Sequence, residues 1–155
     1  MNKTKDQLSG EIRYAIRICQ RQSRLYRHIQ SVGVFLSIVG GSATFSVLLT
    51  SLPHWLSFAG AALLVCSGAS LIAIRPADKA ALNESDIRRY QALMTKVNAL
   101  NETELETAIE EARQSDTPDI ESLRNVAFND VMREFNRDDQ IIPLKPAEKI
   151  MALFA

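Results

Sequence analysis

The sequence has few of the side chains that perform catalysis or hold metal ions. Its 155 residues include two cysteines and two histidines, and none of these four lies after residue 76. The C-terminal half therefore lacks a Cys/His nucleophile pair, a histidine general base and a Cys/His zinc site. No P-loop and no GxGxxG motif occurs. These absences argue against an enzyme, and the sequence predicts no cofactor.

Charge is absent from a long central stretch. Residues 31–74, 44 positions, contain no Asp, Glu, Lys or Arg. One membrane crossing needs about 20 apolar residues, so this stretch is long enough for two. We expect spans over residues 31–50 and 55–74, with Pro53 between them and Trp55 at the membrane interface. The alternative is a helical hairpin buried in the core of a soluble oligomer.

The charges outside this stretch are segregated by sign. Residues 1–30 carry seven Lys/Arg and two Asp/Glu, whereas residues 75–155 carry eleven and sixteen. A signal peptide fits poorly, because a long charged segment precedes the apolar stretch. Basic residues flank both predicted spans (Arg21, Arg24, Arg27, Arg75 and Lys79), and the connection around Pro53 has none. Because cytoplasmic flanks are enriched in Lys/Arg, we expect a multi-pass protein with both termini in the cytoplasm.

Residues 5–30 have the period of an amphipathic helix. The basic face of this helix would carry Arg13, Arg17, Arg21 and Arg24, which advance by four, four and three. The arginines could contact anionic headgroups and set the topology. They could instead form a basic vestibule at a pore mouth, or a surface that meets the acidic C-terminal domain.

Small residues recur every four positions in both predicted spans. They are Gly33, Ser37 and Gly41 in the first span, and Ala62, Cys66 and Ser70 in the second. This spacing lets helices approach closely in lipid, either within the hairpin or between subunits. The hydroxyl residues of the first span could line a polar path or hydrogen-bond to their own helix. They are Ser37, Ser42, Thr44, Ser46 and Thr50.

The predicted fold is all-α, with a membrane domain over residues 1–76 and a small cytoplasmic helical domain over residues 77–155. The boundary falls at Arg75-Pro76. In the second domain we expect helices over 77–100, from the Asn101 cap to Arg113, from Pro118 onward, and over 146–155. About 80 residues make a marginal core, so oligomerisation would help.

One predicted helix gathers residues that suit a phosphate or nucleobase ligand. The candidate ligand-binding residues are Arg124, Asn125, Phe128, Asn129, Arg133 and Arg137. Guanidinium groups bind phosphates bidentately, amides can contact base edges, and Phe128 could stack on a base. Salt bridges with neighbouring acids would also explain these arginines. Asp138-Asp139 could bind a metal, but a solvated loop is the favoured interpretation, and we predict no metal site.

The N-terminal half resembles the two-transmembrane effectors called SLATT domains. The resemblance covers about residues 10–97: the segment RYAIRICQRQSRLYRHIQ, the two spans, and the helix around ADKAALNESDIRRYQALM. Such effectors are thought to permeabilise the bacterial membrane in antiviral defence. The resemblance thus implies a bacterial inner-membrane protein that forms a pore or channel as a homo-oligomer, with a tetramer as one option.

The overall layout also resembles a small type III CRISPR-associated membrane effector. In that kind of protein a soluble C-terminal domain binds a cyclic oligoadenylate made on infection, so the implied ligand is a cyclic oligonucleotide, and no DNA binding is expected. The last 40 residues, with VAFNDVMREFNRDD and PLKP, equally resemble small prophage-encoded membrane proteins. The alternative is therefore a membrane anchor or superinfection-exclusion protein whose tail binds a protein partner.

Overall fold

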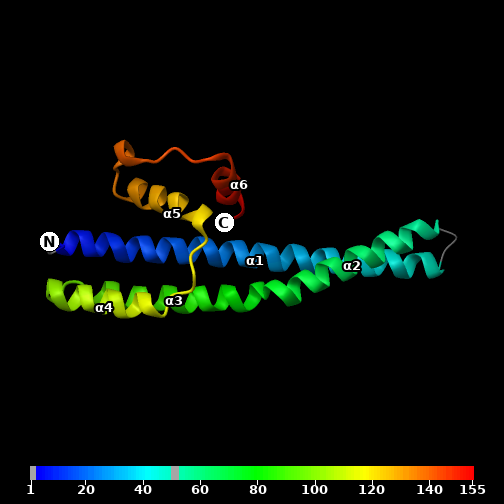
Figure 1. Ribbon diagram of the computed structural model, residues 1–155, viewed down its shortest axis with the longest axis horizontal. Coiled ribbons are helices and arrows are strands. Elements are labelled where there is room, and N and C mark those ends of the chain that lie inside the picture. Colours follow the sequence, from blue (N-terminus) through cyan, green and yellow to red (C-terminus); the bar gives the residue numbers. More distant parts are fainter. Residues whose placement is uncertain (1–2, 50–52) are drawn as a thin grey trace. The chain divides into compact units, whose positions relative to one another are not determined.

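The chain is all-helical over the residues that the structure, a computed structural model, describes: 3–49 and 53–155. The elements are α1 (Lys5–Leu49), α2 (His54–Ile74), α3 (Pro76–Lys96), α4 (Glu102–Gln114), α5 (Glu121–Glu134), the 3₁₀ turn η1 (Asp138–Gln140) and α6 (Pro146–Phe154). Figure 1 shows their order along the chain. The predicted all-α class is confirmed.

Two of these helices are long and apolar enough to cross a membrane, by length and composition. The predicted amphipathic helix and first span form one continuous element, α1, and the second span coincides with α2, which begins at His54. Few residues of either apolar stretch are buried within the chain, unlike those of a core helix. The predicted end of the first span at Thr50 and the turn at Ser51 lie outside the described residues.

The chain divides into two compact units. The residues up to Leu25 group with Lys79–Ala155, and Tyr26–Asp78 form the other unit. We call the first the helical unit and the second the hairpin. The boundary near residue 78 lies close to the expected one, but the first 25 residues belong with the C-terminal helices and not with the spans. The reason is that their apolar side chains fill the core of the helical unit.

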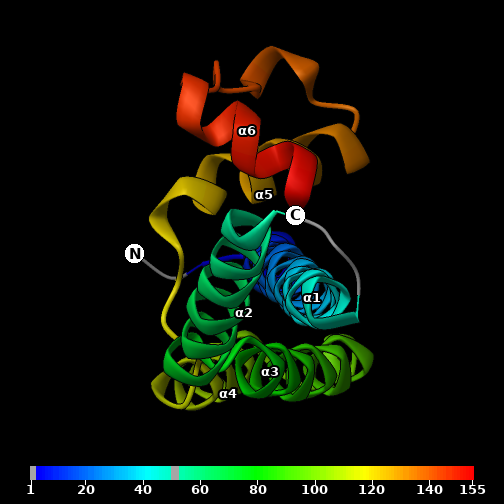
Figure 2. The same cartoon turned by 90° about the vertical axis from the view of Figure 1, so that its right-hand side faces the viewer.

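That core has two parts, and α1 contributes to both. One consists of buried side chains of α1, α3 and α4, namely Leu8, Ile12, Tyr90, Leu105, Ile109 and Ala112. The other joins Ile18 and Cys19 of α1 to Ala127 of α5. Within the helical unit, α1 therefore lies between the α3–α4 pair and α5, as Figure 2 also shows. Because α1 contributes to both parts, it is the central helix of this unit.

Local sequence explains most helix ends. Arg75 adopts a left-handed conformation (φ 49°) that ends α2, and Pro76 then occupies the first position of α3, where its missing N–H costs nothing. Asn101 caps α4, and its capping box with Glu104 is present as predicted. Pro146 begins α6, and the backbone N–H of Lys145 donates to Glu148 at 2.7 Å.

The start of α5 differs from the prediction. The helix begins at Glu121 and not at Pro118. The backbone N–H and the hydroxyl of Thr117 both donate to the buried Asp86 of α3, at 3.0 and 2.8 Å. These two bonds hold the segment before α5 against α3, so the helix starts three residues later.

In the hairpin, glycine allows the two helices to come into backbone contact. A Cβ added at Gly60 would lie 2.7 Å from the carbonyl oxygen of Gly40, and one added at Gly40 would lie 2.6 Å from that of Gly60. One turn of helix along, Ser37 and Ser67 share a hydrogen bond of 2.8 Å between their hydroxyls. At Gly33 a Cβ would meet the Leu71 side chain at 2.6 Å.

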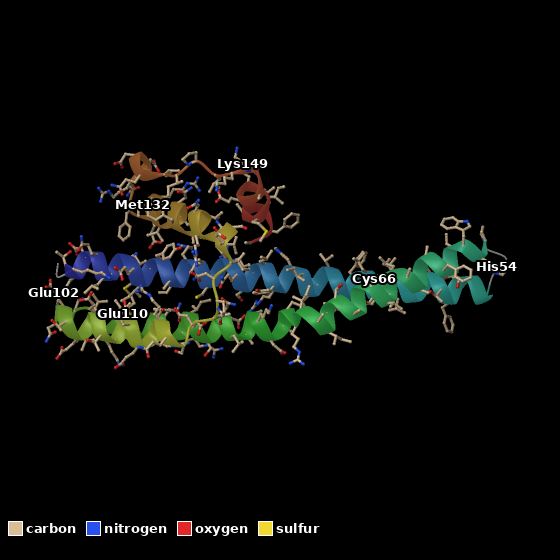
Figure 3. The ribbon with its side chains drawn as sticks, in the orientation of Figure 1. His54, Cys66, Glu102, Glu110, Met132 and Lys149 are labelled. Carbon is tan, nitrogen blue, oxygen red and sulfur yellow. The ribbon has the colours of Figure 1, made fainter. Side chains whose placement is uncertain are left out.

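The small-residue prediction is correct for Gly33 and Ser37, which face α2. Gly41 meets nothing within 4 Å, so Gly40 takes its place in the contact. In α2 the predicted Ala62, Cys66 and Ser70 are exposed, with Cys66 on the outer side of the helix (Figure 3). The hydroxyls of Ser37, Thr44 and Ser46 each donate to the carbonyl four residues earlier, as the second interpretation predicted.

The close approach predicts opposite effects for two substitutions in α2. Gly60→Ala should destabilise the hairpin by about 1–3 kcal/mol, because its Cβ would collide with backbone and force the helices apart. Gly68→Ala meets nothing within 4 Å and should stabilise the helix by up to about 1 kcal/mol. Thermal unfolding in detergent, followed by circular dichroism, measures both. Equal effects would show that the helices do not approach at Gly60.

Candidate functional site

The arginine face of α1 binds the carboxylates of α5. Arg13 and Arg17 both bind Glu134 at the end of α5, Arg17 at 2.9 Å, and the Arg13 guanidinium also stacks on the Phe135 ring. These three charged side chains are about one-third exposed. Exposed ion pairs contribute little each, so this end of the contact orients α5 more than it stabilises it.

Arg21 makes the strongest contact of this face. Its Nε and Nη2 donate to the two carboxylate oxygens of Asp130, at 2.8 and 3.0 Å, in a bidentate pair that is mostly shielded from solvent. Its Nη1 donates to the carbonyls of Ala152 and Ala155 at the end of α6. One guanidinium thus binds α5 and α6 to α1.

These contacts agree with the third of the predicted roles of the arginines, a surface that meets the acidic C-terminal domain. Arg13, Arg17 and Arg21 all bind α5 acids within the helical unit. Arg24, the last member of the predicted face, is exposed.

A cavity of about 510 Å³ lies between α1 and α5. Its apolar wall comes from Tyr14 and Ile18 of α1 and from Phe128 and Met132 of α5. Met132 is labelled on α5 in Figure 3. Gly10 also lines it, and a Cβ there would meet nothing within 4 Å, so the helix leaves the space open. The volume falls within the range of small-molecule sites, about 300–1,000 Å³.

Charged groups surround this cavity, three carboxylates (Glu11, Asp116 and Asp119) and two guanidiniums (Arg113 and Arg124). Arg113 lies 3.3 Å from Glu11, and Arg124 lies 3.6 Å from Asp119. Each arginine therefore already has a carboxylate beside it.

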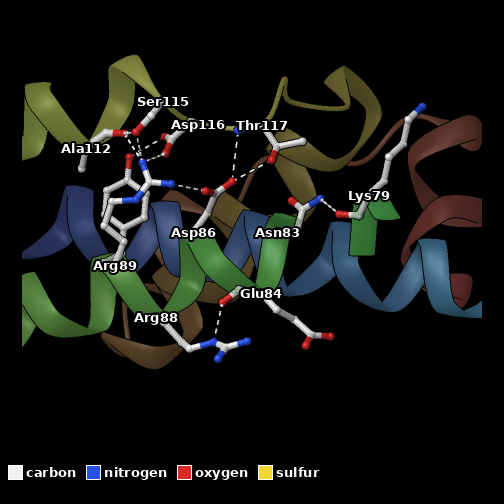
Figure 4. A network of polar contacts seen from close by, with 11 residues as sticks. Lys79, Asn83, Glu84, Asp86, Arg88, Arg89, Ala112, Ser115, Asp116 and Thr117 are labelled. Carbon is white, nitrogen blue, oxygen red and sulfur yellow. Dashed lines mark hydrogen bonds and ion pairs between the residues drawn. The ribbon is translucent and has the colours of Figure 1, made fainter. Parts of the chain in front are cut away.

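Asp116 belongs to a polar network that ties the cavity wall to α3 (Figure 4). It accepts a hydrogen bond from the Tyr90 hydroxyl, while Arg89 binds Asp86 and the Ala112 carbonyl. Burial, ahead of the bond to Asp116, raises the pKa of Tyr90. Burial also raises the pKa of Asp116, and the Tyr90 bond opposes that shift.

The six predicted ligand residues do not form one site. Arg124 and Phe128 line the cavity, one turn apart on α5. The amide of Asn125 donates to Glu148 at 2.9 Å, and the buried Asn129 holds the backbone of Ile142 through both its oxygen and its nitrogen. The remaining two, Arg133 and Arg137, are exposed. The two asparagines therefore hold the chain after α5 in place.

The sequence analysis did not identify the residues of α1 that line the cavity. Gly10, Tyr14 and Ile18 repeat every four residues, which places them on one face beside the arginine face. That repeat could have indicated a second contact surface on α1. Asp116 and Asp119 carry no comparable pattern, because they lie in an irregular segment whose path depends on Thr117 and Asp86.

Burial raises the pKa of the Cys19 thiol to about 12, so at neutral pH the thiol stays protonated. Asp138 and Asp139 begin η1 and are exposed. Among the described residues, no group of three or more His, Cys, Asp or Glu side chains is arranged to hold a metal ion.

Comparison of the chain with protein-family models, curated proteins and solved structures gives no match.

The Arg21 contact predicts a large loss of stability on its removal. Arg21→Met keeps most of the side-chain volume but leaves Asp130 and two carbonyls without their donor, and it should cost about 2–3 kcal/mol. Arg24→Met, at an exposed position three residues on, should change stability by less than about 0.5 kcal/mol. Chemical denaturation of the protein in detergent provides both values. A double variant Arg21→Met/Asp130→Leu should lose less than the sum of its two single changes.

The Glu134 contact predicts a pH effect. The hydrogen bond from Arg17, with a second from Arg13, holds the pKa of Glu134 below its ordinary 4.5. Its stabilising contribution is therefore present above pH 4.5 and is lost as the pH falls through the lowered pKa. Because these groups are one-third exposed, Glu134→Gln should cost less than about 1 kcal/mol at neutral pH. The difference from wild type should vanish in acid and shrink in 1 M salt; a difference that is independent of pH would contradict the ion-pair assignment.

Proposed function

We propose that the protein is a membrane-permeabilising effector of antiviral defence whose helical unit controls its two apolar helices. The observation that carries the proposal is the continuity of α1. The same helix binds α5 through Arg13, Arg17 and Arg21 and then continues into the apolar stretch, to Leu49. Any event that changes how α5 binds α1 therefore acts on the helix that enters the membrane.

We further propose a multi-pass topology in the bacterial inner membrane with both termini in the cytoplasm. The support is the distribution of basic residues, since exposed Arg24 and Arg27 precede the first apolar stretch and exposed Arg75 follows the second. Two spans cannot enclose a pathway, so permeabilisation requires a homo-oligomer, and a tetramer would serve.

The proposed activating signal is a cyclic oligoadenylate. Arg124, Arg133 and Arg137 are exposed and can donate to phosphates. Because one subunit does not bring them together, a ring with several phosphates would be held across a seam between subunits. The ligand would open the assembly only if it binds the active arrangement more tightly than the resting one.

A second candidate function is that of a membrane anchor or superinfection-exclusion protein with a protein partner. The observation that favours it is the apolar surface of α6, where Ile150 is 56% and Leu153 is 81% exposed. Exposed apolar side chains on a short helix suit a partner that covers them.

Calorimetry on the full-length protein in nanodiscs tests the effector proposal. We expect one of cyclic di-, tri-, tetra- or hexa-adenylate to bind, and Arg124→Ala and Arg133→Ala each to weaken binding about 10- to 100-fold, the value of one or two charge-assisted hydrogen bonds. Arg88→Ala, an exposed position on α3, serves as the control.

The bound ring should also release dye from vesicles that contain the protein. Absence of binding to all four rings by the folded protein would refute the nucleotide sensor. Recovery of a specific protein partner that Leu153→Ser abolishes would then support the anchor function.

A further inference from the structure

The cavity between α1 and α5 is lined by Asp116, a half-buried carboxylate that has one unsatisfied oxygen. The Oδ1 atom of Asp116 is buried and accepts no hydrogen bond. Its nearest cation, Arg89 Nη1, is 3.7 Å away and donates instead to the Ala112 carbonyl and the Ser115 hydroxyl. A buried acceptor left in this state costs free energy, so the charge of the Asp116 carboxylate is less stabilised than that of a carboxylate with both oxygens hydrogen-bonded.

Asp119 also lines the cavity and is more exposed than Asp116. Its carboxylate pairs with Arg124, whose Nε lies 3.6 Å away, beyond a normal hydrogen bond. Burial raises the pKa of Asp119, as it does for Asp116. Both carboxylates line the cavity, so a cation placed beside them would be stabilised by their charge.

The opposite wall is apolar and aromatic. Tyr14 of α1 and Phe128 of α5 line the cavity, and the absent side chain of Gly10 leaves room beside them. Aromatic faces attract cations and also pack against apolar groups. The neighbouring Phe135 ring already receives a cation in this way, the Arg13 guanidinium at 5.2 Å.

An anion would fit this cavity poorly. Its two arginines already have carboxylates beside them, Glu11 for Arg113 and Asp119 for Arg124. An anion would have to displace those carboxylates and would still face the charge of Asp116.

We propose that this cavity binds a small organic cation, with its ammonium group against Asp116 and Asp119 and its apolar body against Tyr14 and Phe128. The cavity adjoins the arginines assigned to the nucleotide, since Arg124 lines it beside Asp119, but its proposed ligand is a different one and goes beyond the proposed function. A ligand there contacts α1, α5 and the segment before α5, so it would stabilise the arrangement in which α5 is bound to α1.

Calorimetry with three probes of similar shape and different charge tests the proposal. 2-Phenylethylamine, 2-phenylethanol and phenylacetate are titrated separately into the full-length protein in detergent at neutral pH. We expect the amine to bind at least tenfold more tightly than either of the other two. Equal or tighter binding of the alcohol or the acid would overturn the assignment, as would a folded protein that binds none of the three.

Two pairs of variants locate the site. Asp116→Asn should weaken amine binding at least tenfold, whereas Asp138→Asn, at an exposed acid in η1, should leave it unchanged. Gly10→Phe fills the open space and should abolish binding, whereas Gly10→Ala should retain it. Circular dichroism checks the fold of each variant. Should Asp116→Asn fail to fold, Gly10→Phe decides alone, and full amine binding by the folded Gly10→Phe protein would refute the site.

Discussion

The contact of Arg21 with Asp130 holds the second half of the helical unit together. The guanidinium binds α5 through two parallel hydrogen bonds and α6 through two carbonyls, and it is mostly shielded from water. The cavity exists because α5 lies along α1 in this arrangement, with Phe128 and Met132 facing Tyr14 and Ile18. The more exposed pairs at Glu134 then fix the far end of α5. The placement of α5 and α6 on α1, and with it the α5 wall of the cavity, therefore depends in part on one arginine.

Much of the fold could be predicted from the sequence because local patterns determine it. The charge-free stretch located both apolar helices, and the predicted Asn101–Glu104 box and the predicted helix start at Pro146 are present. These features need only a few neighbouring residues and no knowledge of the tertiary structure. Pro118 fails as a helix start because a distant residue, Asp86, holds the adjacent Thr117 outside the helix.

The candidate site could be predicted less well, because it depends on which face of each helix meets a neighbour. Arg124, Asn125 and Asn129 look equivalent as ligand residues in the sequence. The structure separates them, since Arg124 lines the cavity while the two amides bind Glu148 and the Ile142 backbone. The same ambiguity about which helix face is covered explains the error in the hairpin, where Gly40 and not the predicted Gly41 contacts α2. A four-residue repeat identifies a face but does not say which of two adjacent faces is covered.

The segregation of charge has a second explanation beyond topology. The helical unit combines the basic start of the chain with the acidic tail, and together they carry sixteen Lys/Arg and seventeen Asp/Glu, a net of −1. Arg13, Arg17 and Arg21 therefore serve first in the interface between α1 and α5.

Because these three arginines bind α5, the exposed arginines nearest the apolar stretches are Arg24, Arg27 and Arg75. If α5 leaves α1, Arg13, Arg17 and Arg21 lose the α5 carboxylates that bind them. The part of α1 before the apolar stretch would then carry three positive charges without those partners. In the proposed effector, release of α5 would therefore change the charge of the same helix that continues into the apolar stretch, which is a physical route from the helical unit to the bilayer.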